Sequence, residues 1–197
     1  MPRTVLLNPG PVNITDKVRQ AMALPDLCHR EKEFADLMAA IRNKLLQAFN
    51  IKKEFTSVLV SGSGTAALEM AVSSSLAPGR SMLVIENGVY GERIGKLCDV
   101  YNFHRHTIQL DWGVPPTLDD IEDILKRRSD LEVVSLVHHE TTTGLLNPLQ
   151  AVGELAKKYG KVFLVDCISS LAGDEMDFTC IDLAVGTANK CLQGVPG

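Results

Sequence analysis

Two side chains near the C-terminal end of the sequence could carry out chemistry together. An apolar run, residues 162–165, ends at Asp166, and a second apolar run, residues 183–185, leads to Lys190. Apolar strands of a parallel sheet end at a common edge, so the carboxylate and the amine are expected to face one site. A buried carboxylate can keep a ring nitrogen protonated, and a lysine amine can attach a carbonyl compound.

The cofactor that requires this pair is pyridoxal 5'-phosphate (PLP). Its aldehyde needs a lysine, and its ring nitrogen needs a carboxylate if the ring is to accept electrons. Taken alone, Asp166 could instead cap the following turn and Lys190 could be a solvated side chain, as most such residues are. The pair therefore predicts a PLP site only if other loops supply contacts for the phosphate and the ring.

A phosphate site is predicted where Ser61-Gly62-Ser63-Gly64-Thr65 joins a strand to a helix. Glycines let the backbone approach an anion, and the free amides and dipole of a helix N-terminus favour it. Ser63 and Thr65 add hydroxyl groups to the amide of Gly64. The pattern matches neither G-x-G-x-x-G nor the Walker lysine motif, which favours a single phosphate over a nucleotide, although a plain tight turn would explain it too.

Two more loops carry groups that suit a planar cofactor. Tyr90 lies between glycines in residues 87–93 and could stack on the ring, or it could simply pack on the sheet edge. Thr142, in residues 140–144, could bond a phenolic oxygen, or it could satisfy local backbone groups. Four strand ends with suitable residue types favour one shared site over coincidence.

Helix and strand patterns alternate along the chain and predict an α/β fold. Strands are expected at residues 57–60, 82–85, 106–110, 133–138, 162–165 and 183–185, and helices at 33–49, 66–75, 91–100, 118–128 and 149–159. Thr117 is the expected N-cap of one helix, with Asp120 at the capping-box position. Continuously apolar strands between helices predict three layers: a mostly parallel sheet with helices on both faces.

Composition excludes several other classes of protein. The 197 residues are 45% hydrophobic and 22% charged, with a net charge of −4, which is typical of one substantial core. Basic clusters at 52–53, 126–128 and 157–158 resemble solvated helix faces, so no nucleic-acid partner is expected. Five cysteines without a C-x-x-C pair predict free thiols and a cytoplasmic location. We expect no metal site, signal peptide or membrane span.

The chain as a whole resembles the class V aminotransferases of PLP fold type I, and within them the 2-aminoethylphosphonate aminotransferases. The matching stretches are Asn8-Pro9-Gly10-Pro11, Ser61-Gly62-Ser63-Gly64-Thr65, Asn87-Gly88-Val89-Tyr90-Gly91, residues 139–144, Val165-Asp166 and residues 188–197. The resemblance implies transfer of the amino group of 2-aminoethylphosphonate to pyruvate, giving phosphonoacetaldehyde and alanine. It also implies a homodimer that acts on small molecules.

The resemblance also assigns roles to individual residues. Lys190 would hold the cofactor and act as general base and acid, and Asp166 would pair with the ring nitrogen. Tyr90 would stack on the ring, Ser63, Gly64 and Thr65 would bind the phosphate, Thr142 the phenolic oxygen, and Asn189 the cofactor's edge. Gly10 would approach the substrate.

Domain organisation and two rival functions complete the expectations. Residues 1–30 would form an N-terminal arm and a substrate-side segment, and residues 31–197 a PLP-binding large domain. The large domain would be incomplete and the C-terminal small domain absent, which puts catalysis by this chain in question. The rivals are another class V PLP enzyme, such as an alanine:glyoxylate or serine:pyruvate aminotransferase, and a non-catalytic fragment.

Overall fold

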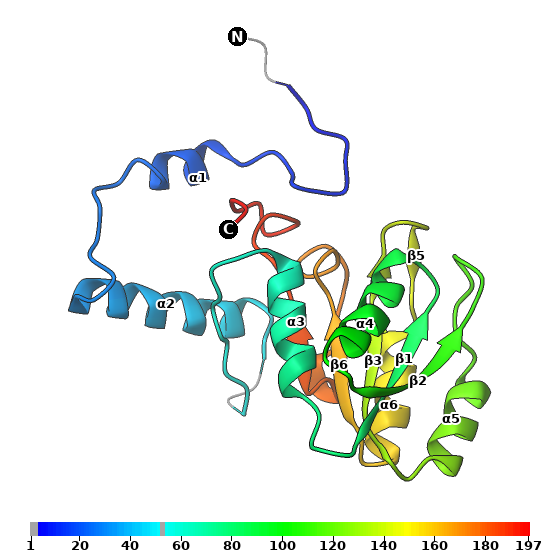
Figure 1. The fold of residues 1–197 in the computed structure, drawn as a ribbon. Coiled ribbons are helices and arrows are strands. Elements are labelled where there is room, and N and C mark those ends of the chain that lie inside the picture. The colour runs from blue at the N-terminus through cyan, green and yellow to red at the C-terminus, as the bar shows by residue number, and fades with distance from the viewer. Residues whose placement is uncertain (1–3, 52–53) are drawn as a thin grey trace.

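A five-stranded parallel sheet forms the centre of the molecule in the computed structural model (Figure 1). The structure describes residues 4–51 and 54–197. The N-terminal residues 1–3, where no signal-peptide core is expected, and the basic pair Lys52-Lys53 lie outside the described residues. The strands of this sheet are β1 (Ser81–Glu86), β2 (His104–Gln109), β3 (Leu131–Val137), β6 (Val162–Asp166) and β7 (Leu183–Val185).

The strand order is β2-β1-β3-β6-β7, so β3 is the middle strand and β6 lies between β3 and the edge strand β7. Asp166, at the end of β6, is in register with Val137 of β3 on one side and Val185 of β7 on the other. Its carboxylate therefore lies at the carboxyl edge of the sheet, flanked by the loops that follow β3 and β7. A two-stranded antiparallel hairpin, β4 (His139–Glu140) and β5 (Leu145–Leu146), leaves the same edge.

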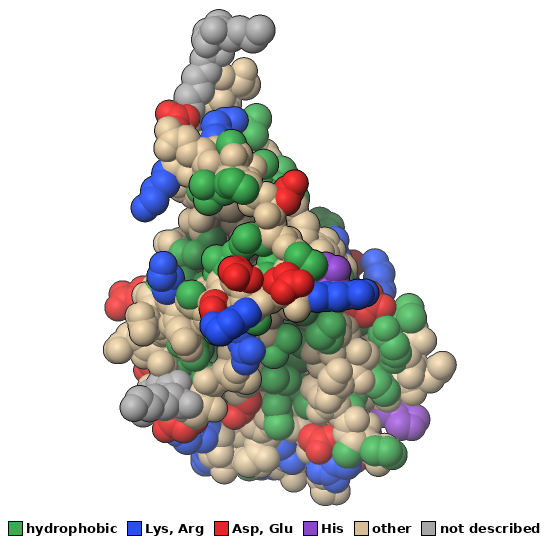
Figure 2. Space-filling view, turned by 90° about the vertical axis from the view of Figure 1, so that its left-hand side faces the viewer, with side chains coloured by type: hydrophobic (Ala, Val, Ile, Leu, Met, Phe, Trp, Pro, Cys, Tyr) green, Lys and Arg blue, Asp and Glu red, His purple; other side chains and the backbone are tan. Residues whose placement is uncertain are grey.

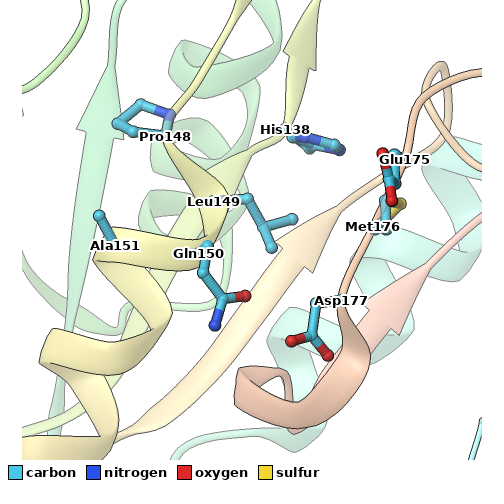
Figure 3. A pocket seen from close by; sticks show the side chains of 8 residues that line it. All are labelled: His138, Pro148, Leu149, Gln150, Ala151, Glu175, Met176 and Asp177. Carbon is cyan, nitrogen blue, oxygen red and sulfur yellow. The ribbon is translucent and has the colours of Figure 1, made fainter.

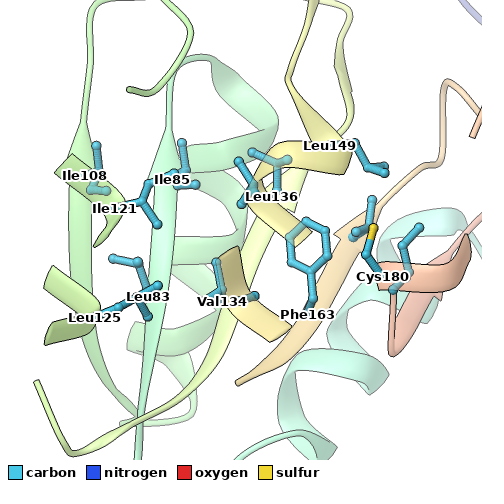
Figure 4. Close-up of a cluster of buried hydrophobic side chains, with 14 of the residues drawn as sticks. Leu83, Ile85, Ile108, Ile121, Leu125, Val134, Leu136, Leu149, Phe163 and Cys180 are labelled. Carbon is cyan, nitrogen blue, oxygen red and sulfur yellow. The ribbon is translucent and has the colours of Figure 1, made fainter. Parts of the chain in front are cut away.

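Helices cover both faces of the sheet, because successive strand residues point to opposite sides. On one face Leu83, Ile85 and Phe163 pack against α5 (Leu118–Arg127) and α6 (Leu149–Lys158), as Figure 4 shows. On the other face Met82 and Val84 pack with α3 (Gly64–Ser74) and α4 (Val89–Val100). The predicted three-layer α/β fold is confirmed.

Most predicted elements are present, with ends that differ by a few residues. The helix predicted at 33–49 is α2 (Lys32–Ala48), and Thr117 caps α5 by accepting a hydrogen bond from the Asp120 backbone N–H at 3.2 Å. Three short elements were not predicted: α1 (Asp16–Ala21), the β4–β5 hairpin and the 3-10 helix η1 (Phe178–Cys180).

The strand predicted at residues 57–60 is wrong. These residues form no ladder with another strand, and Val58 is 72% exposed. The contact that does hold the segment is polar: the Ser57 hydroxyl donates to the Arg42 carbonyl oxygen of α2 at 3.0 Å. A short apolar run forms a strand only where a partner strand is available, and none lies beside this segment among the described residues.

The N-terminal part projects from the sheet (Figure 1). None of the residues of α1 or α2 is buried, whereas Phe49 and Ile51, just after α2, pack against the core. Across residues 4–51 and 54–197, no helix has the length and apolar character that a membrane span requires.

Candidate functional site

A cavity of about 460 Å³ opens at the carboxyl edge of the sheet and brings most of the predicted site residues together. Its lining includes Ser63, Gly64, Thr65, Tyr90, Asp166, Asn189 and Lys190. They come from four loops separated by up to 127 positions in the sequence, 190 − 63. Parallel topology explains the meeting, because every strand of the sheet ends on this side.

Asp166 is the buried acid of the cavity. Its side chain is 3% exposed, and Oδ1 accepts a hydrogen bond from the Ile168 backbone N–H at 2.9 Å. Burial raises the pKa of this carboxyl to about 6, and the charge of Glu140 raises it further, while Arg93 and Lys190 act in the opposite direction. Within the described chain no other hydrogen bond reaches the carboxylate, so Oδ2 can accept one from a ligand.

Lys190 is held by the loop that follows β7. The Gln193 backbone N–H donates to the Lys190 carbonyl oxygen at 2.9 Å, and the neighbouring Asn189 carbonyl accepts from the Val12 backbone N–H at 3.2 Å. The second bond ties the N-terminal arm to this loop. No carboxylate of the described residues forms an ion pair with the Lys190 amine, which leaves it able to react.

Gly10 does not line the cavity, but it packs directly on the Lys190 side chain. A Cβ atom at position 10 would overlap Lys190 Cδ and lie 3.0 Å from Nζ. The φ angle of Gly10, +142°, is also one that side-chain-bearing residues rarely adopt. The arm therefore covers the lysine only because residue 10 is a glycine.

The N-terminus of α3 forms the anion-binding end of the cavity. Ser63 is the N-cap, and its Oγ accepts a hydrogen bond from the Ala66 backbone N–H at 3.2 Å. The amides of Gly64 and Thr65 precede the first bond within the helix, so they remain available. Ile168 packs against Gly64, where an added Cβ would lie 2.9 Å from its Cδ1. Two amides and two hydroxyls thus converge at a positive helix end.

Tyr90 lines the cavity from the first turn of α4, with Arg93 beside it. The guanidinium carbon of Arg93 lies 4.8 Å from the centre of the Tyr90 ring, and Nη1 donates to Thr65 Oγ1 at 3.0 Å. Arg93 is a residue of the cavity that was not predicted from the sequence. Its position three residues after Tyr90 on one helix was the available signal, since residues at that spacing share a face.

Thr142, a predicted site residue, is not among the residues that line the cavity, although its neighbour Thr141 is. Thr141 lines the cavity, whereas the Thr142 hydroxyl donates to Oε1 of Glu140 at 2.6 Å. Oε2 of that buried carboxylate accepts from the backbone N–H groups of Tyr90 and Gly91 at 2.9 and 3.2 Å. Glu140 therefore caps α4, which has no side-chain cap of its own, and joins the Thr142 loop to the start of that helix.

A second hollow of about 610 Å³ lies at the start of α6 and contains none of the predicted site residues (Figure 3). His138, Gln150, Glu175 and Asp177 contribute its polar groups, and His138 Nδ1 lies 3.0 Å from Ser170 Oγ. Although this hollow is larger, it has no lysine. The smaller cavity is the candidate functional site because it alone of the two combines a lysine, a buried acid and an anion-binding helix end.

The comparisons with known proteins agree with this geometry. A family model described as Aminotransferase class-V matches residues 15–197. A 2-aminoethylphosphonate–pyruvate transaminase of Vibrio vulnificus is 40% identical over 196 residues, 98% of this chain and 53% of the relative. A bifunctional phosphonoacetaldehyde hydrolase/aminoethylphosphonate transaminase of Clostridioides difficile is also 40% identical, with 98% of this chain and 31% of the relative covered.

A similar solved structure is that of alanine–glyoxylate aminotransferase from Nostoc sp. It superposes with a TM-score of 0.92 at 33% sequence identity, covering all of this chain and 52% of that one. The chain thus spans about half the length of the Vibrio relative and of this solved structure.

Proposed function

The chain belongs to the class-V aminotransferases, and on that premise we propose that it takes part in PLP-dependent transfer of an amino group from 2-aminoethylphosphonate to pyruvate. The products would be phosphonoacetaldehyde and alanine. One observation carries the proposal: Lys190, Asp166 and the N-terminus of α3 line a single cavity. Class-V aminotransferases are PLP enzymes, and these three features are what that cofactor needs.

The chemical groups of the cavity fit PLP part by part. The phosphate needs hydrogen-bond donors, which the free amides of Gly64 and Thr65 supply. The protonated ring nitrogen needs an acceptor, and Oδ2 of Asp166 is available for it. The aldehyde needs an amine, and Lys190 has no competing carboxylate among the described residues. When bound, the cofactor draws electrons from the substrate carbon that carries the amino group.

The residues of the chain then have separate tasks. Asp166 would keep the ring nitrogen protonated, and the Lys190 amine would move a proton from the substrate carbon to the C4′ carbon of the cofactor. Tyr90 would stack on the cofactor ring. Ser63 and Thr65 donate to the phosphate, and Asn189, whose Oδ1 accepts from the Thr187 hydroxyl at 2.6 Å, borders the cofactor's edge.

Two more contacts are proposed, one of Thr142 with the phenolic oxygen of the cofactor and one of Gly10 with the substrate. For Thr142 to bond the phenolic oxygen, its hydroxyl must accept that oxygen's proton or leave Glu140, since its own hydrogen already points to that carboxylate. Gly10 would place the arm over the reacting carbon, because it already packs on the Lys190 side chain.

The choice of amino donor rests on the relatives. The Vibrio and Clostridioides proteins are both named for aminoethylphosphonate, and the second name joins the transaminase to a hydrolase of phosphonoacetaldehyde. The Nostoc structure supports the alternative donor, alanine with glyoxylate as acceptor, at a lower identity of 33%. We therefore favour the phosphonate.

A donor comparison tests this function. The protein supplied with PLP and pyruvate should form alanine from 2-aminoethylphosphonate and not from serine, and Asp166→Ala should nearly abolish the reaction. Borohydride treatment followed by peptide mapping should place the cofactor on Lys190. Equal alanine formation from serine would favour a serine:pyruvate aminotransferase, and no adduct on Lys190 would favour a non-catalytic fragment.

Assembly and organisation are proposals of the same kind. We divide the chain into an arm and substrate-side segment, residues 1–30, and a PLP-binding domain, residues 31–197, and propose a homodimer in the cytoplasm. The apolar stripe of α2 supports the dimer: Leu37 and Ile41 are 45% and 36% exposed. Figure 2 faces this side and shows hydrophobic side chains open at the surface. All five cysteines are free thiols, which suits a reducing compartment.

A further inference from the structure

Arg93 is a charged side chain of the cavity to which the proposed reaction gives no task. It reaches from α4 to the N-terminus of α3, where Nη1 donates to Thr65 Oγ1 at 3.0 Å. Its guanidinium carbon lies 4.8 Å from the Tyr90 ring centre, so the planar group is held on the ring while its edge faces Thr65. Among residues 4–51 and 54–197, no carboxylate pairs with it at ion-pair distance.

The direction of the Arg93 hydrogen bond decides what Thr65 can do. A guanidinium has only donors, so the Thr65 oxygen is the acceptor of this bond. The hydroxyl hydrogen is therefore not directed at Arg93 and can be donated elsewhere. Thr65 lines the cavity beside two free amides, and an anion there would receive this hydrogen.

The charge of Arg93 acts in the same direction. Because Arg93 forms no ion pair within the described part of the chain, its charge adds to the positive end of the α3 dipole, and the surrounding protein screens it less than water would. The helix end alone would bind many anions weakly. Arg93 adds a full positive charge and a fixed hydrogen-bond donor on one side of the α3 N-terminus.

We propose that Arg93 is a positioning residue for the cofactor phosphate: it turns the Thr65 hydroxyl into a donor toward the anion and balances the anion's charge. This inference rests on the proposed PLP function and deepens it, because it assigns the preference for a phosphorylated aldehyde to one side-chain pair. Arg93 acts through Thr65 and Tyr90, and not on the reacting carbon.

The decisive experiment compares pyridoxal phosphate with pyridoxal, which lacks the phosphate. Binding of each aldehyde to the cofactor-free protein is followed by absorbance for the wild type, Arg93→Gln, Arg93→Lys and Thr65→Val. Arg93→Gln should weaken pyridoxal phosphate binding by about 10- to 100-fold, the effect of losing one charge-assisted hydrogen bond, and change pyridoxal binding by less than about twofold. Arg93→Lys should fall between, since it keeps the charge without the planar donor edge.

A double variant and a phosphate titration separate positioning from mere packing. If Arg93 acts through Thr65, the losses of Arg93→Gln and Thr65→Val will not add in the double variant. Inorganic phosphate should raise the melting temperature of the cofactor-free wild type more than that of Arg93→Gln. Lys96→Gln, which removes a charge from the exposed side of the same helix, is the matched control and should behave as wild type.

Two results would overturn the inference. Equal weakening of both aldehydes by Arg93→Gln would show a general packing role, and fully additive losses would separate Arg93 from Thr65. If Arg93→Gln does not fold, Arg93→Lys carries the same comparison of aldehydes. If the wild type attaches neither aldehyde at Lys190, the proposed function itself is refuted. If Arg93→Gln keeps the wild-type preference for pyridoxal phosphate over pyridoxal, only this inference is refuted.

Discussion

Burial changes the acid–base behaviour of Asp166 more than any neighbouring charge does. The side chain is 3% exposed, and the loss of hydration raises its pKa from 3.8 to about 6. In the folded chain the carboxyl therefore keeps a proton at a pH where the unfolded chain has lost it. The protonated ring nitrogen of a bound cofactor would reverse this balance, because it stabilises the ionised carboxylate.

The raised pKa of Asp166 predicts how stability depends on pH. Stability of the cofactor-free protein should fall as pH rises from about 4 through 6, because the native state holds the proton more tightly, by on the order of 3 kcal/mol in all. Asp166→Asn cannot ionise, so its free energy of unfolding should rise relative to wild type across this range. Urea unfolding at pH 4, 5, 6 and 7 measures the difference.

Asp99→Asn provides a contrast of opposite sign. The side-chain hydrogen bond from Arg105 lowers the pKa of the exposed Asp99 carboxyl. The free energy of unfolding of the wild type should therefore rise relative to that of Asp99→Asn as pH rises. A constant difference between Asp166→Asn and wild type from pH 4 to 7 would contradict the buried, proton-holding carboxyl.

At the scale of elements, Glu140 connects two segments that present site residues. One of its carboxylate oxygens accepts the backbone N–H groups of Tyr90 and Gly91 at the start of α4, and the other accepts the Thr142 hydroxyl and, at 3.3 Å, its backbone N–H. The close approach needs Gly88, because a Cβ at that position would overlap the Glu140 side chain. The position of Tyr90 in the cavity thus depends on a residue from another loop.

Glu140→Gln should therefore destabilise the protein by about 1–3 kcal/mol. An amide has only one acceptor oxygen, so either the α4 backbone amides or the Thr142 backbone N–H loses its acceptor at the buried residue 140. Denaturant unfolding measures the loss. Glu132→Gln is the matched control: within the described chain Glu132 accepts only the Ala77 backbone N–H, at 2.7 Å, and an amide oxygen can replace this acceptor. Equal costs for the two substitutions would argue against a capping role of Glu140.

At the scale of the whole molecule, the α/β body and the N-terminal part differ in how they are stabilised. The body has two apolar clusters, one on each face of the sheet, whose central side chains are fully buried. The residues of α1 and α2 have no such burial. A 17-residue helix with an apolar stripe gains most of its stability from packing that stripe on another surface.

Charges on the α2 stripe should weaken the proposed dimer. Leu37→Glu with Ile41→Glu would bring two carboxylates into an apolar contact, so the dissociation constant should rise by about 10-fold or more. Analytical ultracentrifugation over a range of protein concentrations measures it. Asn43→Glu, on the opposite side of the same helix, should leave association unchanged. An unchanged constant for the double variant would exclude α2 from the interface.

The sequence by itself determined the kind of fold and identified seven of the residues that line the cavity. Apolar runs of strand length between amphipathic helices have few arrangements other than a covered parallel sheet, and in that sheet Asp166 and Lys190 must follow strands that end at one edge. Local chemistry was equally readable where it acts within a few residues, as in the cap of α5 by Thr117.

Only the tertiary structure decided what depends on a partner distant in sequence. Residues 57–60 have a strand-like pattern and no neighbouring strand. Glu140 caps a helix that begins some fifty residues earlier, and Arg93 donates a hydrogen bond to a threonine of another helix. Sequence periodicity indicates which side of a segment is apolar. Hydrogen bonds between loops depend instead on where the packed sheet places the ends of its strands, and these positions are a property of the whole fold.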